Sequence, residues 1–161
     1  MIQLLFGEVR VTTWAPTPVL VLREAEGTRQ LAVWVSAGGA AAVLAGLEPG
    51  SVDHPSTHDL MLEVLAAQSA VVESVEILGV SAGVYSAQLT VNSMAVACRV
   101  TDGVALALKS GAPILISEAL LAEHGVAQPP GEDAHVEADE VEQFREFLAN
   151  VRADDFDERA P

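Results

Sequence analysis

Apolar residues along this chain follow two patterns, an alternation typical of β-strands and a denser spacing typical of helices. The alternating pattern predicts strands at 2–14, 19–24, 30–35, 71–78, 84–91 and 94–100. Glycine, proline, asparagine and serine separate these segments, as turns require. The denser pattern predicts an alanine-rich helix at 37–46, capped by Ser36, and a second helix that follows Thr57.

The segment 98–125 is predicted to contain the helix around which the rest of the domain folds. Thr101 is an expected N-cap, Asp102 suits the positive end of the helix dipole, and Lys109 suits the other end. Gly111 is placed to end the helix. Because the residues between these ends are apolar on almost every side, we expect a buried helix, followed by a short strand and another helix.

The helix after Thr57 begins with two residues that are able to carry chemistry, His58 and Asp59. Thr57 is the expected N-cap, because its hydroxyl can accept a backbone N–H of the first turn. The apolar positions of this helix are Leu60, Met61, Val64 and Leu65. Their spacing supports a helix at this point in the chain.

The order of elements repeats along the chain. Residues 35–38, VSAG, align with residues 100–103, VTDG, at a shift of 65, and Gly46 then aligns with Gly111. Three strands leading into a helix rich in small residues thus occur twice. The pattern predicts an α+β fold built from a duplicated β-β-β-α unit with a largely antiparallel or mixed sheet.

Composition changes near the end of the chain. We expect a domain at 1–126, a linker at 127–138 and an acidic C-terminal helix and tail at 139–161. One apolar stripe runs along this amphipathic helix, formed by Val141, Phe144, Leu148 and Val151. The stripe is able to dock on its own body or a sister subunit, or to serve as a helix ligand for another protein.

Charge sets limits on the partners. The 161 residues carry a formal net charge of −15, and residues 131–161 hold 11 acids against three arginines. No basic surface for nucleic acid or anionic lipid is evident. The N-terminus lacks a signal peptide pattern, and no apolar run reaches the roughly 20 residues of a membrane span. The single cysteine, Cys98, is expected as a buried small hydrophobe, which favours a reducing, cytoplasmic location.

Four residues are candidates for a reactive site, and each has a structural alternative. His58 beside Asp59 is able to act as a base or bind a metal, or Asp59 caps the helix and His58 is solvated. Arg99 is able to hold a phosphate, or to pair with Asp102 or Asp59. Asp102 is either a first-turn carboxylate or a metal ligand. Lys109 is expected to be a solvated helix end.

Three segments of the sequence resemble the bifunctional nuclease family. They are LAVWV at 31–35, STHDL at 56–60, and RVTD at 99–102 with its continuation ALALKSGAPI. Two segments of the tail, FREFL at 144–148 and DDF at 154–156, are similar to actinobacterial members. The block from 98 to 125 is the specific part of the resemblance, which extends over most of the chain.

The resemblance implies an α+β fold, a homo-oligomer, and cleavage of phosphodiester bonds in both DNA and RNA. The positions that match the family's motifs are Thr57, Thr101 and the four candidates His58, Asp59, Arg99 and Asp102. In this hypothesis His58 is the acid/base, Asp59 and Asp102 hold a divalent cation such as Mg²⁺, and Arg99 steadies the phosphate. The net charge opposes a nucleic acid partner, because a polyanion is repelled by an acidic surface.

The chain departs from the family pattern at two places. After the tryptophan strand the family has glycine and later a Glu-Ala pair, whereas this chain has Ser36 and then Gly39-Ala40. The family's Arg-Pro-Ser-Asp-Ala is here Arg-Val-Thr-Asp-Gly, at 99–103. The loss of a carboxylate motivates an alternative hypothesis, in which the chain is a non-enzymatic, self-associating binding or scaffold domain with an acidic partner-binding tail.

Overall fold

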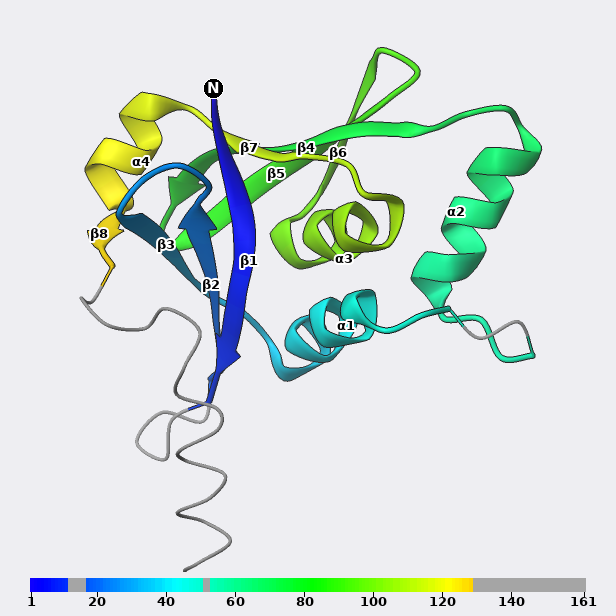
Figure 1. The fold of residues 1–161 in the computed structure, drawn as a ribbon, viewed down its shortest axis with the longest axis horizontal. Helices are drawn as coiled ribbons and strands as arrows, with labels where there is room; N and C mark the ends of the chain where they lie inside the picture. The colour runs from blue at the N-terminus through cyan, green and yellow to red at the C-terminus, as the bar shows by residue number, and fades with distance from the viewer. Residues whose placement is uncertain (12–16, 51–52, 129–161) are drawn as a thin grey trace, which may run out of the picture. The chain divides into compact units, whose positions relative to one another are not determined.

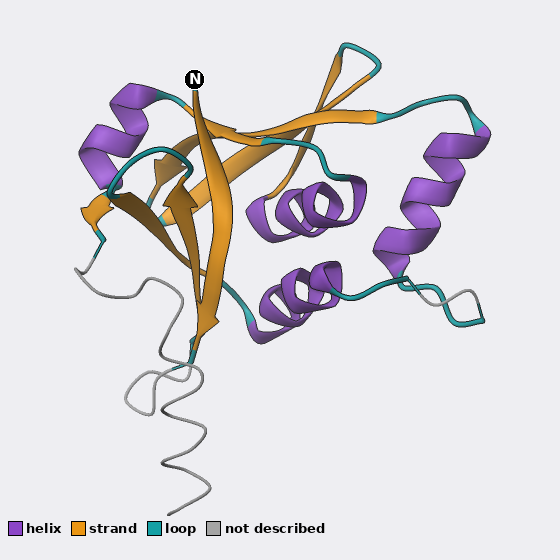
Figure 2. Cartoon of the chain, viewed as in Figure 1, coloured by secondary structure: helices purple, strands orange, loops and turns teal. Residues whose placement is uncertain are grey.

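The computed structural model describes residues 1–11, 17–50 and 53–128, which form an α+β fold (Figures 1 and 2). The predicted C-terminal helix, most of the predicted linker and the predicted strand residues 12–14 lie outside this part of the chain. The strands are β1 (Ile2–Arg10), β2 (Val19–Glu24), β3 (Arg29–Trp34), β4 (Val72–Ser81), β5 (Val84–Val91), β6 (Met94–Arg99), β7 (Ile114–Ile116) and β8 (Val126–Ala127). The helices are α1 (Ala37–Leu47), α2 (Thr57–Ala67), α3 (Val100–Ser110) and α4 (Glu118–His124).

One mixed sheet contains all the described strands, in the order β6-β5-β4-β7-β1-β2-β3-β8. β1, β2 and β3 form one antiparallel meander, and β4, β5 and β6 form another. The short strand β7 joins the two meanders, because it pairs antiparallel with β1 and parallel with β4. The register sets Ile114 opposite both Leu4 and Val75.

The two meanders are structural repeats, each followed by a helix. β2 and β5 begin at Val19 and Val84, and β3 and β6 begin at Arg29 and Met94, so both pairs of strands are 65 residues apart. α3 begins directly after β6, whereas Val35 and Ser36 separate β3 from α1. The helices are therefore offset by 63 residues, two fewer than the alignment of sequence segments predicted.

α3 lies beside α1 and provides much of the core (Figure 1). Its buried residues are Val100, Thr101, Gly103, Val104, Ala105, Leu106 and Ala107, which confirms the predicted buried helix. The two helices approach closely through glycines of α1. A Cβ atom at Gly39 would lie 2.9 Å from Cγ2 of Thr101, and one at Gly46 would lie 3.2 Å from the Cα of Ala105.

α2 contributes less to the core than its apolar composition suggests. None of its residues is buried, and Leu60, Met61 and Val64 are exposed. Leu62 and Leu65 pack at the margin of the core. The helix packs on α3 rather than on the sheet, so only part of its circumference is covered.

Candidate functional site

The N-terminus of α3 holds Arg99 and Asp102 in direct contact. Arg99 donates from Nε to Oδ2 of Asp102 at 2.6 Å and from Nη2 to Oδ1 at 3.1 Å. This pairing raises the pKa of the Arg99 guanidinium above its usual value. The arginine side chain remains 76% exposed, so the guanidinium is available to an approaching ligand.

α2 brings His58 to the same carboxylate. Nε2 of His58 lies 3.5 Å from Oδ1 of Asp102, and the histidine side chain is mostly covered. Asp102 therefore lies between a histidine from one helix and an arginine at the start of another. Three of the four residues proposed from the sequence converge, and the Arg99–Asp102 pairing is one of the two alternatives expected for Arg99.

A capping box fixes the first turn of α2. Ser56, not Thr57, is the N-cap: its Oγ accepts the N–H of Asp59 at 3.2 Å, and Oδ2 of Asp59 accepts the N–H of Ser56 at 2.9 Å. The prediction that Thr57 caps this helix is wrong. A serine three residues before an acid satisfies two backbone donors at once, so the helix begins one residue earlier than expected.

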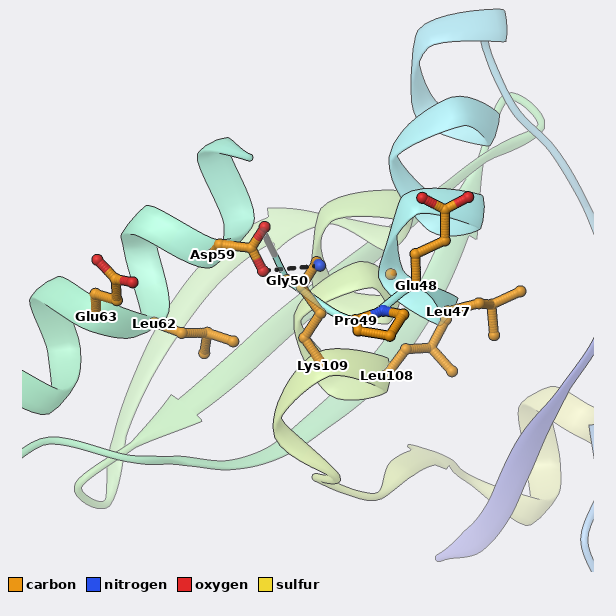
Figure 3. Close-up of a pocket in the computed structure, with 10 residues that line it drawn as sticks. Leu47, Glu48, Pro49, Gly50, Asp59, Leu62, Glu63, Leu108 and Lys109 are labelled. Carbon is orange, nitrogen blue, oxygen red and sulfur yellow. Dashed lines mark ion pairs between the residues drawn. The ribbon is translucent and has the colours of Figure 1, made fainter. Parts of the chain in front are cut away.

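Asp59 has a different partner from the other three candidates. Its Oδ1 lies 2.8 Å from Nζ of Lys109, and the dashed line in Figure 3 marks this ion pair. The hydrogen bonds from Lys109 and then Ser56 lower the pKa of Asp59 to about 2. Lys109 is only 7% exposed, so the prediction that it is a solvated helix end is wrong. α2 packs against α3, and its Asp59 carboxylate holds this lysine.

The donor set does not fit a cation shared by Asp59 and Asp102. The Asp59 carboxylate is held by Ser56 and Lys109, and the Asp102 carboxylate is held by Arg99 and lies near His58. Their positively charged partners, Lys109 and Arg99, would oppose a divalent ion at either carboxylate. Within the described residues, no three His, Cys, Asp or Glu side chains are grouped so as to hold a metal.

Thr101 is a helix residue and not a cap. The N-cap position of α3 is Arg99, whose side chain makes no capping hydrogen bond. Thr101 is buried where α3 passes Gly39 of α1. The prediction that Thr101 caps the helix is wrong because β6 continues to Arg99 and the helix follows without a connecting segment.

Two pockets flank this region, and their charges differ. The larger has a volume of about 520 Å³, and its lining combines apolar residues with three acids and one lysine (Figure 3). Its charged residues are Glu48, Asp59, Glu63 and Lys109. The smaller, of about 210 Å³, includes Arg99 and Thr101 and contains no acidic residue. An anionic ligand is therefore favoured at the smaller pocket.

Cys98 is another titratable group near Asp102. Its side chain is half-buried rather than fully buried as expected. Burial, and secondarily the negative charge of Asp102, raise the pKa of the thiol above its usual value. A raised pKa suppresses the thiolate, so this cysteine is a poor nucleophile at neutral pH.

The cap role of Ser56 and the ion pair of Lys109 were not predicted, although the sequence contains a pattern that indicates each one. The segment 56–59, STHD, contains a serine and an acid at capping-box spacing. Lys109 follows Asp102 by seven residues, which returns to the same helix face after two turns. A helix that contacts this face at Asp102 can also contact Lys109, as α2 does through its two adjacent residues His58 and Asp59.

Comparison with known proteins now identifies the family. The family described as "Bifunctional nuclease domain" matches residues 20–129. The chain belongs to the bifunctional nuclease domain family. Two relatives, both named as uncharacterized proteins, are MT1877 and Rv1829 from two strains of Mycobacterium tuberculosis. Each is 39% identical over 156 residues, covering 92% of this chain and 93% of the relative.

The family match extends over both repeats from β2 onward, and includes all the residues of the Arg99–Asp102–His58 cluster. No helix among residues 1–11, 17–50 and 53–128 is both long and apolar enough to cross a membrane.

Proposed function

We propose that this member of the bifunctional nuclease domain family hydrolyses phosphodiester bonds in DNA and RNA at the cluster of His58, Asp102 and Arg99. Membership of the family supports the reaction class. The observation that carries the choice of site is the position of Asp102, 3.5 Å from His58 and paired to an exposed arginine. A histidine next to a carboxylate and a guanidinium is suited to moving protons next to a phosphate.

Each residue would have a distinct role in the reaction. Water would attack phosphorus while the P–O bond to the leaving oxygen breaks, and His58 would take the proton from this water. The leaving oxygen would take a proton from solvent, and His58 would return its own proton to solvent. Asp102 would orient His58, and Arg99 would offset charge on the phosphate oxygens. Asp59 would act indirectly, by locking the first turn of α2 through Ser56 and Lys109.

The test is hydrolysis of labelled single-stranded DNA and RNA by purified full-length protein and by His58→Ala. The matched control is His54→Ala, an exposed histidine just before α2. Loss of a general acid or base lowers kcat by about 10²- to 10⁴-fold. We expect this loss in His58→Ala alone. Equal activity in the wild type and His58→Ala, with both folded, would assign the hydrolysis to a contaminant and refute the site.

A second candidate function is a self-associating scaffold, and the edge strand β6 favours it. β6 ends the sheet, and Met94, Ala95, Val96 and Ala97 are all exposed. Edge strands usually carry charges or proline that prevent pairing with another chain, and this strand has neither before Arg99. A second copy of this chain is the occupant we propose for the open edge.

Charge at the two ends of β6 supports pairing with an identical strand. Glu73 accepts the N–H of Ser93 just before the strand, and Arg99 ends it. Antiparallel pairing of two copies would bring Glu73 of each protomer near Arg99 of its partner. Val96→Lys should convert an oligomer to a monomer in light scattering, whereas Val126→Lys, on β8, should not. A wild-type monomer at all concentrations would refute the interface.

A further inference from the structure

The end of β3 carries an exposed tryptophan. Trp34 is 59% exposed, although tryptophan is on average among the more buried residues. It lines the same pocket of about 210 Å³ as Arg99, together with Val84 and Tyr85. A flat aromatic surface therefore lies next to the exposed guanidinium of the candidate site.

Other residues that line this pocket favour an anion. Arg99 provides the positive charge, and the helix that follows it has no side-chain cap for its first turn. Thr101 also lines the pocket, and it is only 7% exposed. The uncapped backbone donors of α3, the hydroxyl of Thr101 and the guanidinium of Arg99 together suit phosphate oxygens.

The size of the pocket limits what can occupy it. Pockets for drug-sized ligands are about 300–1,000 Å³, so a volume of about 210 Å³ suits one planar ring system. A base within a duplex is stacked on its neighbours and cannot offer its face to an indole. Only an unpaired base is able to enter, as in proteins that bind single strands on aromatic side chains.

We propose that Trp34 stacks on one base of a single-stranded nucleic acid while Arg99 and the N-terminus of α3 hold the adjoining phosphate. The inference rests on the proposed function, because it supplies the substrate class for the same site. Stacking depends on the face of the base and not on the sugar, so one pocket accepts both DNA and RNA. It also provides attraction that does not depend on charge, which offsets the repulsion of a polyanion by a chain of net charge −15.

The experiment measures binding separately from hydrolysis. Full-length protein carrying His58→Ala is titrated at low salt with fluorescein-labelled oligo-dT, oligo-U and a DNA duplex of the same length. Trp34→Ala and Trp34→Phe are introduced in this background. Leu44→Ala is the matched control, because Leu44 is an exposed apolar residue of α1 that does not line the pocket.

We expect Trp34→Ala to weaken binding of both single strands by about 10- to 100-fold, as loss of one stacked base predicts. Trp34→Phe should retain most of the affinity, and Leu44→Ala should retain all of it. The duplex should bind more weakly than either single strand. Equal affinities of Trp34→Ala and its parent, or preference for the duplex, would overturn the inference. Failure of the proposed function is a different result, namely equal hydrolysis by the wild type and His58→Ala.

Discussion

Nε2 of His58 on α2 lies 3.5 Å from Oδ1 of Asp102 on α3, and the same carboxylate accepts two hydrogen bonds from Arg99. In the proposed mechanism, this arrangement would make Asp102 a positioning residue between a proton-transfer group and a phosphate-binding group. The two helices that carry the cluster come from different parts of the chain, so its geometry depends on how α2 docks against α3.

Replacing Asp102 by Asn should lower kcat for hydrolysis by about 100-fold, because misplacing a reacting group by about 1 Å has a cost of that order. The substitution removes an exposed ion pair with Arg99, which contributes about 0–1 kcal/mol to stability. Steady-state kinetics and thermal unfolding together check this prediction. A large drop in Tm, or a rise in KM with unchanged kcat, would contradict the positioning role.

The Asp59–Lys109 pair should make stability depend on acid pH. The folded pKa of Asp59 is about 2, below the ordinary value of 3.8. Stability from a lowered pKa is fully present above the unfolded value and is lost as pH falls through the folded value. We therefore expect the contribution of Asp59 to be complete above about pH 4 and to decline toward about pH 2.

Urea unfolding from pH 2 to 6 measures this dependence, with the wild type compared to Asp59→Asn and Lys109→Met. The difference between the wild type and Asp59→Asn should shrink as pH falls through that window. In Lys109→Met the pKa of Asp59 should lie closer to its ordinary value, because the largest cause of its lowering is removed. The pH range over which Asp59 contributes a changing stability should therefore be narrower. A difference independent of pH would show that the pair does not form.

Alanine substitutions at two adjacent glycines of α1 should change the free energy of unfolding in opposite directions. A Cβ at Gly39 would lie 2.9 Å from Cγ2 of Thr101, whereas a Cβ at Gly38 meets no atom within 4 Å. Gly39→Ala should lower the free energy of unfolding by about 1–3 kcal/mol through overpacking. Gly38→Ala should raise it by about 0.5–1 kcal/mol, because alanine loses less backbone entropy in a helix. Chemical denaturation distinguishes these outcomes, and a stabilising Gly39→Ala would contradict the close approach of α1 and α3.

Binding of single strands should depend only weakly on salt. Each phosphate neutralised contributes a slope of about −0.7 to the logarithmic dependence of affinity on salt concentration for single strands. With Arg99 as the cation of the smaller pocket, the slope should be about −0.7, and Arg99→Gln should bring it near zero. Fluorescence anisotropy at several salt concentrations measures both slopes. An unchanged slope in Arg99→Gln would mean that the phosphate is held elsewhere.

Local patterns predicted the secondary structure well, because strands and helices are set by short-range alternation and by glycine and proline. The strand 19–24, the strand 84–91 and the C-terminal glycine of α3 were located from such signals. The predicted first residues of the helices were less accurate. Where two hydroxyl residues are adjacent, as at Ser56 and Thr57, the reciprocal hydrogen bonds with Asp59 decide the cap.

By itself the sequence determined the α+β class, the repeated unit, the buried helix α3 and the residues able to carry chemistry. These follow from periodicity, capping and side-chain type, which act over a few residues. Only the tertiary structure decided the partners: Asp102 for His58, Lys109 for Asp59, and a common pocket for Trp34 and Arg99. Such pairings depend on how helices and strands distant in the chain pack together, and no local pattern encodes that geometry.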